Sequence, residues 1–198
     1  MNNPQVDQIR LENKDIIKLR KARGAMHKAL KFLNIVPNIN LVLPPNFKDI
    51  IPKKPINLTQ DEIVRSYNQI PIAITYIEQA KLISGNLENY ALHVEQFLLK
   101  SRGSSKEFNI LIGEEKEIID FCKKIVTHLN KIETKLRNIV PLYQELKPGL
   151  LDIKNTNYIY ILKSLFLSAK ILSNLDLHFG KLKTWEMQIG IRSKRSRR

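Results

Sequence analysis

Side chains that could carry out enzyme chemistry are few and far apart in this chain of 198 residues. The one cysteine is Cys122, and the four histidines, at positions 27, 93, 128 and 178, lack the spacing of zinc ligands. Neighbouring glycines are at least ten residues apart, so their amides cannot converge on a phosphate as they do in a nucleotide-binding loop. The sequence therefore predicts a protein without catalytic residues, metal, cofactor or small-molecule substrate.

The closest approach to an acid–base pair is the acidic run at Glu114, Glu115 and Glu117. Catalytic carboxylates that work as a pair generally come from different segments, whereas acidic residues are common in the first turns of a helix. Cys122 follows the same run within an apolar pattern, between Ile118 and Ile125, which is typical of a buried structural thiol. Neither feature favours an enzyme.

The positive charges at the C-terminal end have a clearer chemical use. Such an end could be a flexible solubilising segment, a nuclear address or an electrostatic arm for phosphates. We favour the third, because guanidinium groups bind phosphate bidentately, and we expect no base specificity, because neither interleaved aromatics nor a recognition-helix signature occurs. The cations concerned are Arg192, Lys194, Arg195, Arg197 and Arg198.

The net charge of +14 is distributed unevenly along the chain. Residues 1–58 hold 11 Lys or Arg against 4 Asp or Glu, residues 59–149 hold 12 against 12, and residues 150–198 hold 10 against 3. A neutral middle between two basic ends predicts a folded body with two charged contact regions.

Within residues 1–36 the sequence predicts a basic amphipathic helix. Apolar residues gather on one side at helical spacing and cations gather on the other. We expect the basic side to contact nucleic acid, with an acidic protein, an anionic membrane or plain solvent as the alternatives. Its cations are Arg10, Lys14, Lys21, Lys28 and Lys31.

Residues 37–58 are predicted to form an extended, proline-rich arm, because their prolines lack backbone donors and disfavour a helix. Their many large apolar side chains must lie against the chain's own body or against a partner. We favour docking on a neighbouring protein subunit, which would leave the arm sensitive to proteases in the free chain. The partner-binding side chains would be Leu41, Leu43, Phe47, Ile50 and Ile51.

The body is predicted to be a helical bundle over residues 59–189. Thr59 and Glu62 have the spacing of a capping box that starts a helix, and Pro71 should kink or divide that helix. A second helix has apolar spacings that alternate between four and three residues, as in helices packed at shallow angles. This seam consists of Ile118, Cys122, Ile125, Leu129, Ile132, Leu136, Ile139, Tyr143 and Leu146.

The last predicted helix begins near Asn155 and is apolar on more than one face, which indicates the central member of the bundle. Charged residues interrupt it at intervals of about two turns, so a buried helix is a better account than a membrane span. The apolar pattern ends after Trp185, and residues 190–198 are predicted to be a basic tail.

The expected fold is all-α, with a bundle of three long helices and a fourth, basic N-terminal helix tethered by the arm. The expected function is that of a non-catalytic structural subunit of a large nucleoprotein assembly, such as a viral particle or a ribosome-like machine. Its partners would be other protein subunits and nucleic acid. A protein-binding helical adaptor or scaffold and a peripheral membrane protein are the alternatives, and we do not expect contact with a membrane surface. The single cysteine favours the cytoplasm, or a particle assembled in a reducing compartment.

Overall fold

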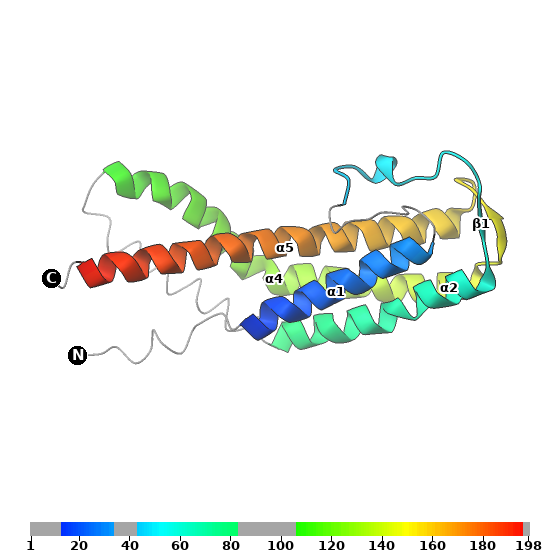
Figure 1. The fold of residues 1–198 in the computed structure, drawn as a ribbon, viewed down its shortest axis with the longest axis horizontal. Coiled ribbons are helices and arrows are strands. Elements are labelled where there is room, and N and C mark those ends of the chain that lie inside the picture. Colours follow the sequence, from blue (N-terminus) through cyan, green and yellow to red (C-terminus); the bar gives the residue numbers. More distant parts are fainter. Residues whose placement is uncertain (1–12, 34–42, 83–105, 196–198) are drawn as a thin grey trace.

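The structure is a computed structural model that describes residues 13–33, 43–82 and 106–195 (Figure 1). Most of these residues are helical, and the strands among them form one two-stranded sheet, so the prediction of an all-α protein is confirmed as to class. The labelled helices are α1 (Asn13–Phe32), α2 (Gln60–Tyr67), α4 (Lys106–Glu145) and α5 (Thr156–Arg195), with a short 3-10 helix, η1 (Phe47–Asp49). The strands are β1 (Ile56–Leu58) and β2 (Gly149–Leu151), and residues 69–82 form a further helical segment.

α1 is amphipathic as predicted, but it is not a tethered appendage. Leu19, Met26 and Leu30 are at most 3% exposed, because the helix packs along α5 and α2 (Figure 1). Its apolar stripe is wide enough to face two neighbouring helices, which makes α1 part of the common core. The apolar side of this helix thus packs on the chain's own body, whereas part of its connection to the arm, residues 34–42, is outside the described residues.

The part of the arm that the structure describes also packs on the body. The ring of Phe47 lies against that of Phe166 in α5, with centroids 5.8 Å apart, and Ile50 is 2% exposed. Lys170 of α5 donates a hydrogen bond to the carbonyl oxygen of Pro45 at 2.6 Å. These contacts bury described apolar side chains of the arm within the chain itself, without the entropic cost of association, and docking of the arm on a neighbouring subunit stays a prediction.

α2 begins at the predicted capping box and ends shortly before Pro71, which was predicted to kink or divide the helix. The Thr59 hydroxyl accepts a hydrogen bond from the Glu62 amide, and the Glu62 carboxylate accepts one from the Thr59 amide, which confirms the capping box. The helix ends at Tyr67, whose carbonyl group lies four residues before Pro71, where the proline ring would clash with a continuing helix. Helical structure resumes over residues 69–82, so Pro71 divides the helix.

α4 buries the predicted seam as far as its side chains are described. From Ile125 onward every seam position is at most 5% exposed, whereas Lys131 on the opposite side is exposed. Cys122 lies within α4, but its side chain is outside the described residues. α5 runs antiparallel to this part of α4 and also contacts α1 and η1.

The two strands close one end of the elongated molecule (Figure 1). They pair antiparallel, with Ile56 opposite Leu151 and Leu58 opposite Gly149. Gly149 has a φ of 129°, a region in which side chains are strained, and it allows the chain to turn from α4 into β2. The other end of the molecule is formed by the last turns of α5 and the first turns of α4.

Candidate polyanion-binding face

The two basic regions of the sequence come together in the fold, because α1 and α5 lie side by side. α1 contains seven Lys or Arg and one Asp, and α5 contains seven Lys or Arg and two acidic residues. By contrast, α4 contains seven of each sign, and residues 60–82 contain two cations and three acidic residues. The excess positive charge of these helices is therefore on α1 and α5, whereas α4 and residues 60–82 are close to neutral.

Two contacts fix the antiparallel register of α1 and α5. Near the end of α1, the Tyr158 hydroxyl donates to the carbonyl oxygen of Leu33 at 3.4 Å. Nearer its start, Arg20 and Arg23 both pair with Asp176, at 2.9 and 3.1 Å. Two guanidinium groups share one carboxylate, so this contact leaves a net positive charge at the α1–α5 junction.

Four lysines on the neighbouring elements α1, η1 and α5 are exposed and have no ion-pair partner among the described residues. We call them the basic face. They are Lys28, Lys31, Lys48 and Lys163. Lys28 and Lys31 were predicted as nucleic-acid contacts; both are exposed, and this role stays a prediction.

Lys21 turns toward a different neighbour. Its Nζ atom lies 5.4 Å from the ring centroid of Tyr76, in the helical segment over residues 69–82, which is a cation–π contact. Of the other predicted contacts in this region, Lys14 is in α1 but its side chain is outside the described residues, as is all of Arg10.

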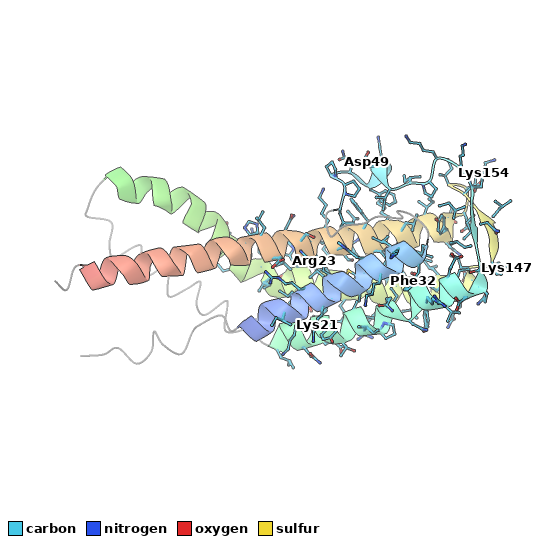
Figure 2. The ribbon with its side chains drawn as sticks, in the orientation of Figure 1. Lys21, Arg23, Phe32, Asp49, Lys147 and Lys154 are labelled. Atoms are coloured by element: carbon cyan, nitrogen blue, oxygen red, sulfur yellow. The ribbon has the colours of Figure 1, made fainter. Side chains whose placement is uncertain are left out.

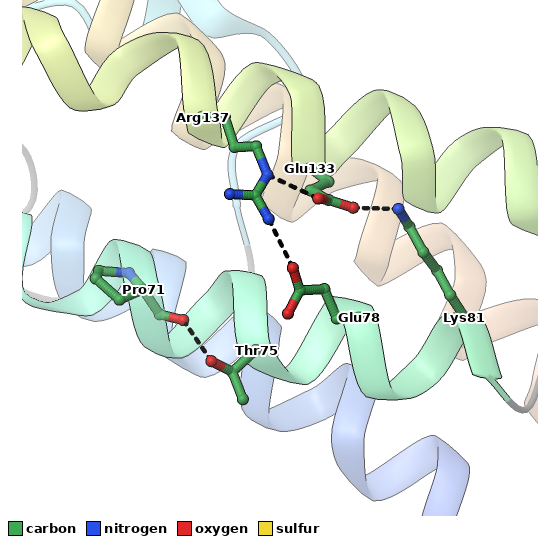
Figure 3. A network of polar contacts seen from close by, with 6 residues as sticks. All are labelled: Pro71, Thr75, Glu78, Lys81, Glu133 and Arg137. Carbon is green, nitrogen blue, oxygen red and sulfur yellow. Dashed lines mark hydrogen bonds and ion pairs between the residues drawn. The ribbon is translucent and has the colours of Figure 1, made fainter.

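Glu78 and Glu133, in residues 60–82 and in α4, form ion pairs with cations of the same two segments (Figure 3). Arg137 of α4 bonds to Glu133 at 2.7 Å and to Glu78 of the segment 69–82 at 2.6 Å, and Lys81 also pairs with Glu133. Hydrogen bonds from Lys81 and Arg137 lower the pKa of Glu133. These carboxylates thus tie α4 to the segment 69–82 and do not neutralise the basic face.

The basic end of α5 differs from the predicted tail. α5 continues to Arg195, so residues 190–195 have a helical backbone where an extended segment was expected. The physical reason is that cations in a last turn interact favourably with the negative end of the helix dipole. Arg192, Lys194 and Arg195 lie in this turn, while their side chains, and all of Arg197 and Arg198, are outside the described residues.

The arm residues predicted to bind a partner lie mostly against the body. Leu43 and Phe47 are half-buried against the core, Ile50 belongs to the core, and Ile51 is half-buried. Leu41 lies outside the described residues. Ile50 could reach a partner only if the arm left the body.

Some buried polar side chains in the described core form hydrogen bonds between helices. Ser66 of α2 donates to the carbonyl oxygen of Ala29 in α1 at 2.9 Å and shares a 2.6 Å hydrogen bond with the Tyr143 hydroxyl of α4. Burial raises the pKa of Tyr143, and burial raises the pKa of Tyr158 to about 12, so both phenols are neutral donors at physiological pH. These bonds connect three helices across the core.

His27 is the one described histidine that is fully buried, at 7% exposure. Neither ring nitrogen has a hydrogen-bond partner among the described residues. Burial lowers its pKa below 6.5, and the nearby Arg23 lowers it further. Within the same residues, no group of three or more His, Cys, Asp or Glu is gathered where it could hold a metal ion.

Sequence reasoning missed Lys48 and Lys163. It treated the first as part of an apolar arm and the second as an interruption of an apolar helix. Their surface positions follow from how η1 lies on α5, which is a long-range packing relation that no local pattern encodes.

Comparisons with protein-family models, with curated proteins and with solved structures found no significant match for this chain. In the part of the chain that the structure describes, no helix is both long enough and apolar enough to cross a bilayer.

Proposed function

We propose that the protein is a non-catalytic structural subunit of a large nucleoprotein assembly, and that it contacts phosphates without base specificity. The observation that carries the proposal is the side-by-side packing of the basic helices α1 and α5. Lys28, Lys31, Lys48 and Lys163 are exposed on α1, η1 and α5, and none of them has a counterion among the residues that the structure describes. A phosphate backbone is the chemical complement of such a surface, because its binding releases condensed counterions.

We further infer that the helices form one bundle with α5 as its central member, since α5 contacts α1, α4 and η1. A rigid bundle would present the basic face in a fixed geometry to nucleic acid. The basic end of α5 would extend the contact, and other protein subunits of the assembly would complete it. Assembly would take place in a reducing compartment such as the cytoplasm.

The alternative of a helical adaptor depends on the apolar side of α1 entering a groove of a partner protein. Met26 and Leu30 are fully buried in the chain's own core, so this mode would require α1 to leave the body. The same requirement applies to a membrane protein that inserts this helix. The basic face needs no such opening, which is why we prefer the polyanion-binding function.

The test is equilibrium binding of the full chain to duplex DNA and duplex RNA over a series of salt concentrations. Two double variants probe the face separately: Lys28→Gln with Lys31→Gln on α1, and Lys48→Gln with Lys163→Gln on η1 and α5. Each pair should lower the slope of log affinity against log salt by about 2 on duplex DNA, because each lost phosphate contact contributes roughly 0.9.

The matched control is Lys124→Gln with Lys131→Gln, two exposed lysines on the neutral helix α4. Its slope should equal that of the unchanged protein. Deletion of residues 191–198 removes five cations and should lower the slope by roughly 4 to 5. If the control pair changed the slope as much as the two test pairs, lysines anywhere on the surface would contribute equally to binding, and the proposed basic face would be refuted.

A further inference from the structure

The two-stranded sheet at the end of the molecule exposes an apolar side chain to solvent. Side chains alternate across a strand, so Leu58 and Leu151, which are at most 5% exposed, point into the core. Leu150 lies between two inward positions and is 75% exposed, opposite the exposed Asn57. Within the part of the chain that the structure describes, the outward side of the sheet therefore presents an exposed leucine.

A second exposed aliphatic side chain and four exposed lysines lie on the segments that lead into and out of the two strands. Ile153, two residues beyond β2, is 61% exposed. Lys53 and Lys54 precede β1, and Lys154 follows Ile153, so all three belong to the segments that leave the strand pair at the end where Ile56 lies opposite Leu151. Lys147, just before β2, belongs to the other end of the strand pair, and Figure 2 shows Lys147 and Lys154 at the same end of the molecule. We call these six side chains the tip: Lys53, Lys54, Lys147, Leu150, Ile153 and Lys154.

The carboxylates near the tip do not pair with its lysines. Asp152 accepts a hydrogen bond from the Lys154 amide, Asp49 accepts one from the Asn46 amide, and Glu145 accepts one from the Asn157 side chain. No ion pair joins a tip lysine to any acidic residue in the described ranges. The lysine ammonium groups are thus left for an external anion, next to two exposed aliphatic side chains.

We propose that the tip is a docking site for an anionic lipid surface, separate from the basic face. Aliphatic side chains can enter the boundary between headgroups and acyl chains while lysines contact anionic headgroups, and the two contributions to the binding free energy add. A phosphate backbone alone offers no apolar surface to Leu150 and Ile153.

A protein partner fits the tip less well than a membrane does. Protein interfaces are enriched in arginine and aromatic residues and depleted of lysine, and the tip contains neither arginine nor an aromatic ring. The arginines whose side chains are described all take part in ion pairs with acidic residues of the helical segments: Arg20, Arg23, Arg65 and Arg137. Strongly hydrated lysines suit a fluid layer of anionic headgroups, which demands no fixed bidentate geometry.

The experiment is flotation of the full-length protein with vesicles of phosphatidylcholine alone and of phosphatidylcholine with about one-third phosphatidylserine. We expect binding to the second vesicle type only, with an affinity that falls as salt increases. The triple variant Lys53→Gln, Lys54→Gln, Lys154→Gln should lose about a hundredfold in affinity, since each lysine near an anionic surface contributes roughly fivefold. Leu150→Ser should lose severalfold without a change in salt dependence.

Matched controls lie elsewhere on the surface. Leu177, which is 61% exposed on α5, provides Leu177→Ser as the apolar control, and Lys124→Gln, Lys131→Gln, Lys135→Gln on α4 is the charge control. Neither control should weaken vesicle binding by more than about twofold. The charge control removes only a small share of the long-range electrostatic attraction, because salt screens charges that lie far from the bound surface. Circular dichroism should show unchanged helical content in every variant, because the substituted side chains lie outside the core.

Several outcomes would overturn the proposal. Absence of binding to phosphatidylserine vesicles would refute it, as would equal binding to neutral vesicles or equal losses in the tip and control variants. If the tip triple variant lost duplex binding while vesicle binding was absent, the tip would belong to the polyanion-binding surface instead. The basic-face variants at Lys28 and Lys31 should retain vesicle binding, so failure of this inference is distinguishable from failure of the proposed function.

Discussion

Ile50→Ala tests whether the arm is part of the folded body. The side chain is 2% exposed and belongs to the common core, so its truncation removes three buried carbon atoms. At roughly 0.8 kcal/mol per methylene, the lost transfer free energy is about 2.4 kcal/mol, and the remaining cavity brings the expected range to about 2–5 kcal/mol. For a chain of this size, 3 kcal/mol corresponds to a decrease in melting temperature of roughly 6–12 °C.

The assay is chemical denaturation followed by circular dichroism, together with limited proteolysis of the native protein. The unchanged protein should resist cleavage within residues 43–58, and Ile50→Ala should make this segment sensitive. Ile153→Ala is the matched control, because the same atoms are removed from a side chain that is 61% exposed, and it should cost less than about 1 kcal/mol. Equal effects of the two substitutions, or ready cleavage of the unchanged arm, would refute the packing of the arm on its own body.

Three further predictions concern the core. Leu129→Asp should cost at least about 3 kcal/mol or unfold the protein, because it places an unpaired charge at a fully buried seam position, whereas Lys131→Asp should be nearly silent in the same denaturation assay. Ser66→Ala should cost about 1–3 kcal/mol, because it leaves the buried Tyr143 hydroxyl without its partner; Tyr143→Phe in the same background should recover part of the loss. His27 should make stability depend on pH: since its folded pKa is lowered, the unfolded chain binds the proton more tightly, and the free energy of unfolding should fall as pH decreases below about 6.5. His27→Leu should flatten this part of the stability curve, and an unchanged curve would mean that the histidine is not buried as described.

Local sequence patterns predicted the helices, because the start, the end and the buried side of a helix depend on residues that are close in the sequence. The capping box at Thr59 and Glu62 is a contact across three residues, and the end of α2 at Tyr67 follows from Pro71. The seam of α4 predicted which face is buried, so Leu129 and Lys131 lie on the sides expected for them. Such features require no knowledge of the partner helix.

Long-range packing could not be predicted from the same patterns. Prolines indicated that the arm is not helical, but the contact of Phe47 with Phe166 joins residues more than a hundred positions apart. The amphipathic pattern of α1 indicated that it needs an apolar surface, yet did not identify α5 as that surface. The helical backbone up to Arg195 was missed because the apolar rhythm stops after Trp185.

The candidate site was predicted in part. Charge counting along the chain located two basic regions, and Lys28 and Lys31 are exposed as expected. These regions come together because α1 and α5 pack in one antiparallel register. That register is fixed by the hydrogen bond from Tyr158 to Leu33 and the ion pair of Arg20 with Asp176. The role of the basic regions in binding nucleic acid stays a prediction.

The most direct test of the polyanion-binding function is the affinity of the full chain for two duplexes of unrelated sequence, measured over a range of salt concentrations. Four lysines of the basic face and five cations of the C-terminal end would give a log–log slope of about −8 if all contact phosphates. We predict equal affinities for the two sequences and a slope steeper than about −4. A slope near zero, or strong preference for one duplex, would contradict phosphate contacts as the basis of binding.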